Sequence, residues 1–202
     1  MSTLNALPFA LPVLAYLFGS ISTSVLVCRA LKLPDPRSLG SGNPGATNVL
    51  RFGGKKAAAV TLAGDFLKGF LPVLAARALD ADAMVIAAAG GASFLGHLYP
   101  LFFGFHGGKG VATAAGVFAG LSAALLAALL AVWLAAALLS RYSSAAALTA
   151  ALAAPWLVAW LLPGAGYLAL AAGMVALLFW RHRGNIRRLA AGEESKIRLR
   201  GR

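Results

Sequence analysis

Long apolar runs separated by short polar segments are the feature that most limits how this chain can fold. The runs cover residues 4–31, 57–79, 84–103, 111–139, 145–162 and 166–180. About 20 apolar residues in a helix cross a lipid bilayer. The hydrophobic content of 60%, the charged content of 12% and the mean hydropathy of +0.80 fit the same environment. We therefore predict an all-α polytopic membrane protein, a single integral membrane domain over residues 1–202.

Basic residues set the expected topology. Lys and Arg number 18 against 6 Asp and Glu, and all but Lys68 and Arg77 lie in residues 29–56, at Lys109 and Arg141, or in residues 181–202. The positive-inside rule puts such segments in the cytoplasm. The expected cytoplasmic segments are residues 32–56, 104–113, 140–144 and 181–202. We predict seven transmembrane helices, some short, with the N-terminus outside and the C-terminus cytoplasmic.

Residues 111–139 are too long for one straight helix and short for two. Lys109 before them and Arg141 after them are both expected inside, so the chain between them crosses an even number of times. We predict a tight hairpin of two helices that turns near residues 116–122, with the first helix too short to span fully.

The net charge of +12 does not predict a nucleic-acid partner. The charge is divided among the connecting segments instead of lining one soluble face. Anionic membrane lipids and phosphorylated substrates are the expected partners. The single cysteine, Cys28, excludes an internal disulfide and a cysteine metal cluster.

Glycines surround a lysine in the segment 104–113. Glycine N–H groups, the start of the following helix and the Lys109 ammonium are suited to binding phosphate. The expected binding residues are Gly107, Gly108, Lys109 and Gly110. The alternative is a flexible turn with a lysine reaching to the membrane surface. The spacing does not fit a Walker A loop, because Phe103 and Gly110 replace its first glycine and its Ser or Thr.

Short polar side chains gather among glycines in the segment 32–56. They are Ser41, Asn43, Thr47, Asn48 and Arg51, a set suited to phosphate oxygens. A turn followed by a helix N-cap is the alternative. A second helix, expected over residues 57–79, carries Asp65 and Lys68 on one face. These two either pair with each other or turn Lys68 toward the anion.

Two later segments complete the expected cytoplasmic face. Ser144 follows Arg141, and His182, Asn185 and Arg188 recur at a spacing of three, as on one face of a helix. Anchoring at the membrane surface explains these residues equally well. Because all the polar segments are expected on one side, we predict one shared site.

Few kinds of chemistry remain open to such a site. Of the six acidic residues only Asp65 is expected near the glycine segment, so we predict neither a metal nor a cofactor. No histidine is followed by Asp five residues later, which excludes the His-Asp pair of the common glycerolipid acyltransferases. The remaining means of catalysis are positioning of the substrates and stabilisation of charge around their phosphate groups.

Three long motifs resemble those of the bacterial acyl-phosphate:glycerol-3-phosphate acyltransferases. They are Ser41-Gly42-Asn43-Pro44-Gly45-Ala46-Thr47-Asn48-Val49-Leu50-Arg51; Gly96-His97 with Pro100 and Gly107-Gly108-Lys109-Gly110-Val111-Ala112-Thr113; and Arg181-His182-Arg183 with Asn185-Ile186 and Arg188-Leu189. The resemblance implies transfer of a fatty acyl group from acyl phosphate, not acyl-CoA, to the 1-hydroxyl of glycerol 3-phosphate. The products are lysophosphatidic acid and inorganic phosphate, in the first step of phospholipid synthesis. It also implies a bacterial cytoplasmic (inner) membrane enzyme, with Thr113 among the residues that bind the phosphate or substrate. The basic segments place the active site on the cytoplasmic face. A soluble enzyme that produces acyl phosphate is an expected partner.

The expected mechanism is direct attack by the glycerol hydroxyl. Lys109 and the glycine amides hold the departing phosphate, with the polar side chains of residues 41–51 in the same pocket. His182, Asn185 and Ser144 hold glycerol 3-phosphate. The proton acceptor is His182, His97 or a substrate phosphate, and the resemblance favours the substrate. A transporter of an anionic solute or lipid is the competing class.

Overall fold

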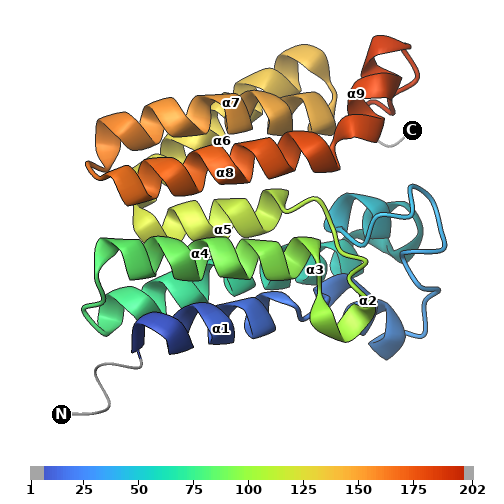
Figure 1. Ribbon diagram of the computed structural model, residues 1–202. Coiled ribbons are helices and arrows are strands. Elements are labelled where there is room, and N and C mark those ends of the chain that lie inside the picture. Colours follow the sequence, from blue (N-terminus) through green and yellow to red (C-terminus); the bar gives the residue numbers. More distant parts are fainter. Residues whose placement is uncertain (1–6, 198–202) are drawn as a thin grey trace. The chain divides into compact units, whose positions relative to one another are not determined.

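The computed structural model describes residues 7–197, and every regular element over these residues is a helix (Figure 1). The elements are α1 (Leu7–Gly19), α2 (Thr23–Ala30), α3 (Ala46–Ala78), α4 (Ala83–Leu98), the 3-10 helix η1 (Leu101–Phe103), α5 (Val111–Leu121), α6 (Ala123–Ser140), α7 (Ser143–Leu161), α8 (Ala165–Arg181) and α9 (Arg183–Ala190). The chain divides into two compact units, one up to Leu121 and one from Ser122 onward. The single domain over residues 1–202 stays a prediction.

Five spans in the described part of the chain are long and apolar enough to cross a membrane. They are Pro8–Ala30, Ala46–Ala78, Ala83–Phe103, Ala123–Ser140 and Ser143–Leu161. A sixth is α8 together with α9, if this pair, bent by 58°, counts as one span. The helix α5 has 11 residues, about 16 Å at 1.5 Å per residue, roughly half of a hydrocarbon core. The seven crossings and the outside N-terminus stay predictions.

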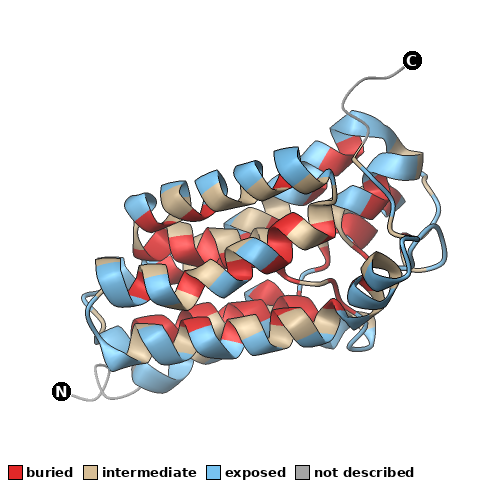
Figure 2. Cartoon of the chain, turned by 90° about the horizontal axis from the view of Figure 1, so that it is seen from above, coloured by how far each residue is buried: buried red, intermediate tan, exposed pale blue. Residues whose placement is uncertain are grey.

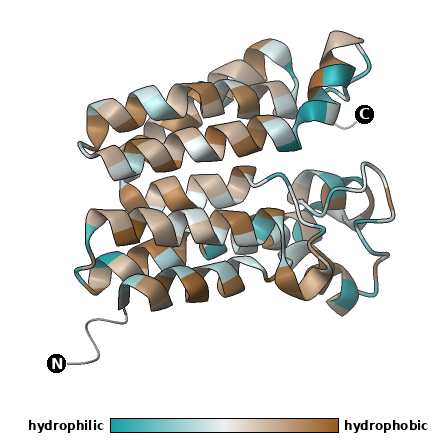
Figure 3. Ribbon diagram, viewed as in Figure 1, coloured by the Kyte–Doolittle hydropathy of each residue, from teal (hydrophilic) through white to brown (hydrophobic). Residues whose placement is uncertain are grey.

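Large apolar side chains cover the outside of both units. Phe9 in the first unit is 77% exposed, and Leu139 and Trp156 in the second are 88% and 80% exposed. Figure 2 shows buried positions on the inward faces of the helices, and Figure 3 shows mostly apolar helices with hydrophilic residues concentrated in α9 and the connecting segments. An apolar outer surface of this extent fits lipid as the surrounding solvent.

The first apolar run is broken, although we predicted one helix over residues 4–31. The helix α1 ends at Gly19 and α2 starts at Thr23. Lys68 of α3 donates a hydrogen bond of 3.0 Å to the main-chain oxygen of Ile21, between the two helices. A carbonyl group released from a helix in an apolar environment needs such a donor.

The helix α3 begins eleven residues earlier than the predicted residue 57, at Ala46. Gly54 interrupts it with φ 79° and ψ 178°, a conformation that favours glycine. The residues before Gly54 therefore form a short helical segment at an angle to the membrane-spanning part. Thr47, Asn48 and Arg51 lie on this helical segment, where we predicted a loop.

The helices α3, α4 and α5 pack against one another in the first unit, with α1 against α4. Small residues allow the crossing of α3 and α5, because a β-carbon at Gly116 would collide with the main chain of Phe66. The helix α4 ends at Leu98, earlier than the predicted residue 103, since Pro100 disfavours helix at the preceding residue. The segment 104–110 then leads to the start of α5.

The second unit consists of α6 to α9, in which α7 packs against α6 and α8. The break predicted near residues 116–122 occurs at Ser122, whose side chain caps α6 by accepting a hydrogen bond of 3.3 Å from Leu125 N–H. The helices α7 and α8 begin and end within two residues of the predicted 145–162 and 166–180.

Candidate functional site

The glycine segment before α5 is packed tightly against the end of α4. Gly108 N–H donates a hydrogen bond of 3.2 Å to the main-chain oxygen of His97. A β-carbon at Gly107 would collide with the main-chain oxygens of His97 and Leu98, and one at Gly108 with Nε2 of His97. A larger residue at Gly107 would have to displace main chain, and one at Gly108 would have to displace the His97 ring, so the two glycines permit this close main-chain path.

The start of α5 has the hydrogen-bond donors that we predicted for an anion site. Gly110 has φ 87°, and its carbonyl oxygen accepts the first helical hydrogen bond, 2.7 Å from Ala114 N. The N–H groups of the first helical turn have no partners within the helix. Thr113 in this turn is fully buried, and its hydroxyl has no hydrogen-bond partner among the described residues. Lys109 is half-buried directly before the helix.

The first motif lies against the glycine segment. A β-carbon at Gly108 would be 3.3 Å from the main-chain oxygen of Pro44. Ser41, Thr47 and Arg51 are exposed nearby in the sequence, and Asn43 is half-buried. The structure therefore brings the main chains of the two motifs together at Pro44 and Gly108.

Asn48 shapes the first motif from within. Its side-chain amide donates hydrogen bonds of 2.9 Å to the main-chain oxygens of Pro36 and Leu39, and its Oδ1 accepts one of 3.0 Å from Ser41 N–H. Asn48 is 2% exposed. Both amide hydrogens are thus in use, and we revise its predicted phosphate contact to a role in holding the segment.

Arg37 connects the segment before the first motif to η1. Its guanidinium donates to both carboxylate oxygens of Asp35 and, over 3.2 Å, to the main-chain oxygen of Phe103. The hydrogen bonds from Arg37 hold the pKa of Asp35 below its ordinary value, and those to Asp35 raise the pKa of Arg37. The pair therefore keeps its charges at neutral pH.

Lys68 pairs with Asp65, which is the alternative to its predicted contact with the anion. Nζ of Lys68 is 2.9 Å from Oδ1 of Asp65, and both side chains are 4% exposed. Nδ1 of His97 lies 3.6 Å from the same oxygen. We therefore withdraw Lys68 from the phosphate ligands. No group of three or more side chains suited to a metal ion occurs over residues 7–197.

In the second unit Glu194 joins three residues of the predicted site. Its carboxylate accepts hydrogen bonds of 2.8 Å from Ser144, 2.5 Å from Asn185 and 2.7 Å from Arg188. Burial raises the pKa of Glu194, but these hydrogen bonds outweigh burial and lower it below its ordinary value. The sequence analysis missed this residue. Its signal was an acidic pair, Glu193-Glu194, inside an otherwise basic segment.

His182 is 3% exposed between α8 and α9. Its Nδ1 lies 2.8 Å from the main-chain oxygen of Leu178. Because a carbonyl oxygen only accepts, Nδ1 carries the hydrogen, and Nε2 is the proton-accepting nitrogen of the neutral ring.

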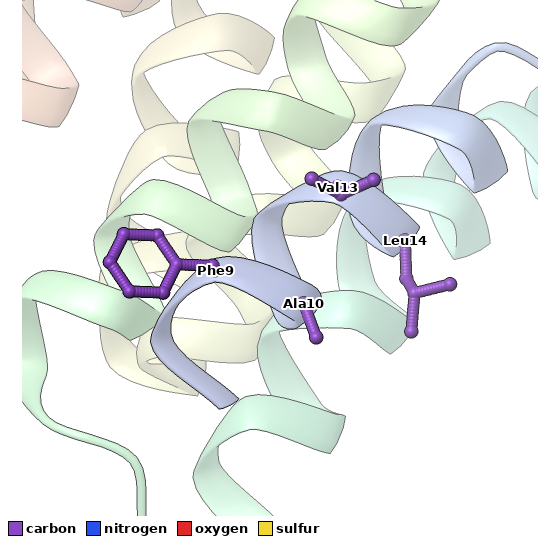
Figure 4. Close-up of a pocket in the computed structure, with 4 residues that line it drawn as sticks. All are labelled: Phe9, Ala10, Val13 and Leu14. Carbon is purple, nitrogen blue, oxygen red and sulfur yellow. The ribbon is translucent and has the colours of Figure 1, made fainter. Parts of the chain in front are cut away.

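An apolar depression of about 460 Å³ lies beside α1 (Figure 4). It is lined by Phe9, Ala10, Val13 and Leu14, and Phe9 is 77% exposed. Its lining contains no polar side chain that could bind a phosphate. We therefore assign it to the lipid-facing surface.

The family model for glycerol-3-phosphate acyltransferase matches residues 9–192 of the chain. The chain belongs to this acyltransferase family. It is 56% identical over 183 residues to the glycerol-3-phosphate acyltransferase of Thioalkalivibrio sulfidiphilus, with 91% of this chain and 90% of that protein covered. It is 52% identical over 187 residues to that of Halorhodospira halophila, with 93% and 95% covered.

The family fold is also known from crystal structures of PlsY (YgiH), an integral membrane glycerol 3-phosphate acyltransferase. The glycerol 3-phosphate form has a TM-score of 0.90 at 43% identity and covers 95% of this chain and 96% of that chain. The lysophosphatidic acid form has a TM-score of 0.87 at 43% identity, with 94% of each chain covered. The predicted family and the all-α polytopic membrane class are thus confirmed.

The motifs of the acyltransferase family fall into both units. The first unit contains the polar residues from Ser41 to Arg51 and the glycine segment with Lys109 and Thr113. The second contains Ser144, His182, Asn185 and Arg188. The roles of these residues in binding and catalysis stay predictions.

Proposed function

We propose that the protein transfers a fatty acyl group from acyl phosphate to the 1-hydroxyl of glycerol 3-phosphate. The products are lysophosphatidic acid and inorganic phosphate, in the first step of phospholipid synthesis. The observation that carries this proposal is the close contact of the glycine segment with the first motif at Gly108 and Pro44, directly before α5. Its relatives are acyltransferases, and the similar crystal structures are glycerol 3-phosphate and lysophosphatidic acid forms.

The glycine segment binds the phosphate of the acyl donor. Lys109 supplies a positive charge, and the N–H groups of the first turn of α5 supply donors. Gly107, Gly108 and Gly110 shape the main chain around the phosphate, since Gly108 N–H already donates to His97. The buried Thr113 hydroxyl is a further donor at the same helix start. Ser41, Asn43, Thr47 and Arg51 of the first motif complete the phosphate ligands from the exposed side.

The chemistry is a direct displacement at the acyl carbon. The 1-hydroxyl oxygen of glycerol 3-phosphate forms a bond to this carbon, the bond to the phosphate oxygen breaks, and inorganic phosphate leaves with the electron pair. Acyl phosphate is an activated anhydride, so positioning and charge stabilisation are sufficient. The single cysteine, Cys28, is buried, which argues against a thioester intermediate.

The second unit binds glycerol 3-phosphate. Ser144 and Asn185 are the polar ligands, His182 contacts the glycerol, and Arg188 contributes positive charge. Glu194 orients Ser144, Asn185 and Arg188 through its three hydrogen bonds. The hydroxyl proton goes to Nε2 of His182, to His97 or to a phosphate oxygen of the substrate, and the family resemblance favours the substrate oxygen.

The active site faces the cytoplasm of a bacterial inner membrane. This orientation rests on the basic segments and the positive-inside rule. The fatty chain lies between helices and enters from the inner leaflet. A soluble enzyme that produces acyl phosphate is the expected supplier of the donor, and anionic lipids contact the basic C-terminal segment.

The test is phosphate release by the purified protein in detergent. Glycerol 3-phosphate is supplied with palmitoyl phosphate or with palmitoyl-CoA, and Lys109→Ala is measured beside the wild type. We expect phosphate and lysophosphatidic acid from palmitoyl phosphate alone, and a loss of both products in the variant. Folded protein that turns over neither donor would overturn the proposal in favour of a transporter, because transport forms no product in detergent.

A further inference from the structure

The glycine segment packs against the last turn of α4. His97 contributes its main-chain oxygen to Gly108 N–H and its ring to the space beside Gly108. A β-carbon at Gly110 would collide with the ring of Phe94 and the side chain of Leu98. The position of the His97 ring therefore helps to determine the path of the segment.

A buried ion pair lies on the other side of this ring. Oδ1 of Asp65 is 3.6 Å from Nδ1 of His97 and 2.9 Å from Nζ of Lys68. Asp65, Lys68 and His97 are 4%, 4% and 5% exposed. Lys68 also donates to Ile21, and its own main-chain oxygen accepts a hydrogen bond from Ser93 of α4. The pair is thus fixed by α3, α4 and the break between α1 and α2.

The two ring nitrogens of His97 face different partners. Nδ1 faces the carboxylate of Asp65, and Nε2 faces Gly108. The contact with Asp65 is electrostatic, because 3.6 Å is too long for a hydrogen bond. We therefore expect removal of the carboxylate charge to let the ring rotate into or away from the space of the glycine segment. The proposed mechanism gives Asp65 and Lys68 no task of their own.

We propose that Asp65 and Lys68 are positioning residues, which hold the glycine segment in its phosphate-binding conformation through His97. The inference rests on the proposed function only in taking acyl phosphate as the ligand of that segment. A purely structural role of the ion pair would affect folding without a specific effect on phosphate binding. The two roles therefore differ in what they do to binding constants.

The main variant replaces both charges together, Asp65→Asn with Lys68→Met, because a single replacement leaves one buried charge unpaired. The control is Arg77→Met. Arg77 donates to the main-chain oxygens of Gly120 and Leu121, at the opposite end of α5 from the glycine segment. Like the double variant, Arg77→Met removes a side chain of α3 that donates hydrogen bonds to main-chain oxygens of another segment.

The measurements are the equilibrium Kd for inorganic phosphate, the KM for each substrate, kcat and the unfolding midpoint in detergent. We expect the double variant to raise the phosphate Kd and the palmitoyl phosphate KM about tenfold, with kcat and the glycerol 3-phosphate KM changed by less than about threefold. We expect Arg77→Met to lower the midpoint and to leave both KM values unchanged.

Folded double variant with the wild-type phosphate Kd and KM values would overturn the inference. If the double variant does not fold, the phosphate Kd is measured instead for His97→Gln, which leaves the ion pair in place. A higher phosphate Kd in His97→Gln supports the positioning role, and an unchanged Kd overturns the inference. Wild-type protein that binds phosphate without acyl transfer would count against the proposed function alone, and the ratio of phosphate Kd values would still decide the inference.

Discussion

Asn185 and Glu194 are joined by a hydrogen bond of 2.5 Å from Nδ2 to Oε1, which ties α9 to the chain that follows it. The same carboxylate accepts from Ser144 at the start of α7 and from Arg188 of α9. One acidic side chain, 9% exposed, thus orients three proposed ligands of glycerol 3-phosphate.

Glu194→Gln should weaken this arrangement. We expect a loss of about 2 kcal/mol in the free energy of unfolding, because hydrogen bonds to a charged group contribute about 1.5–3 kcal/mol each and Gln keeps only part of them. The KM for glycerol 3-phosphate should rise about tenfold. Glu193→Gln is the matched control, since Glu193 is exposed. Equal effects of the two replacements would contradict the assigned role.

The same residue predicts a pH dependence of stability. The pKa of Glu194 is lowered in the folded protein from an ordinary value of 4.5, so protonation is easier in the unfolded chain. Its contribution is fully present above pH 4.5 and is lost as the pH falls through the lowered pKa. The difference in unfolding midpoint between wild type and Glu194→Gln should shrink between pH 7 and about pH 3. A constant difference would contradict the assignment.

Gly108→Ala should nearly abolish activity. The added β-carbon would collide with Nε2 of His97, so either the buried His97 ring or the glycine segment has to shift. A displacement of about 1 Å at a reaction centre lowers rates about 100-fold. Gly173→Ala in α8 is the control, because its β-carbon would meet no atom within 4 Å. Initial rates of phosphate release from palmitoyl phosphate compare the two variants.

Asn48→Asp should disturb the first motif. Aspartate cannot donate to the main-chain oxygens of Pro36 and Leu39, and each buried acceptor without a partner costs about 1–3 kcal/mol. We expect a lower unfolding midpoint together with a loss of activity. Ser38→Ala removes an exposed side-chain hydrogen bond of the same segment and should have little effect. A variant with wild-type midpoint and rate would exclude the proposed role of Asn48.

The bounds of α7 and α8 in the second unit were predicted from the sequence to within two residues, for a simple physical reason. Its helices α7 and α8 are apolar runs bounded by Arg141 and by the Pro163-Gly164 turn, so local composition determines where they begin and end. The motifs also led us to predict phosphate binding at the glycine segment and Lys109, because phosphate binding needs residue types that are rare in a membrane helix. This binding stays a prediction.

Long-range partners account for what the sequence did not predict. The break after α1 depends on a lysine 47 residues away that donates to Ile21. The role of Asn48 depends on carbonyl groups that only the folded segment brings within reach. Glu194 lies in a charged segment that resembles a solvated tail, and only its contact with Ser144, 50 residues away, distinguishes it.

The interruption between α1 and α2 has a consequence for how sequences of this kind can change. A mutation that straightened the two helices into one would leave the Ile21 carbonyl bonded within the helix and Lys68 without this acceptor. The charged Lys68 ammonium, with only Asp65 as its remaining partner, would then be energetically costly inside the bilayer. Substitutions at the interruption and at the ion pair should therefore be accepted by selection together or not at all.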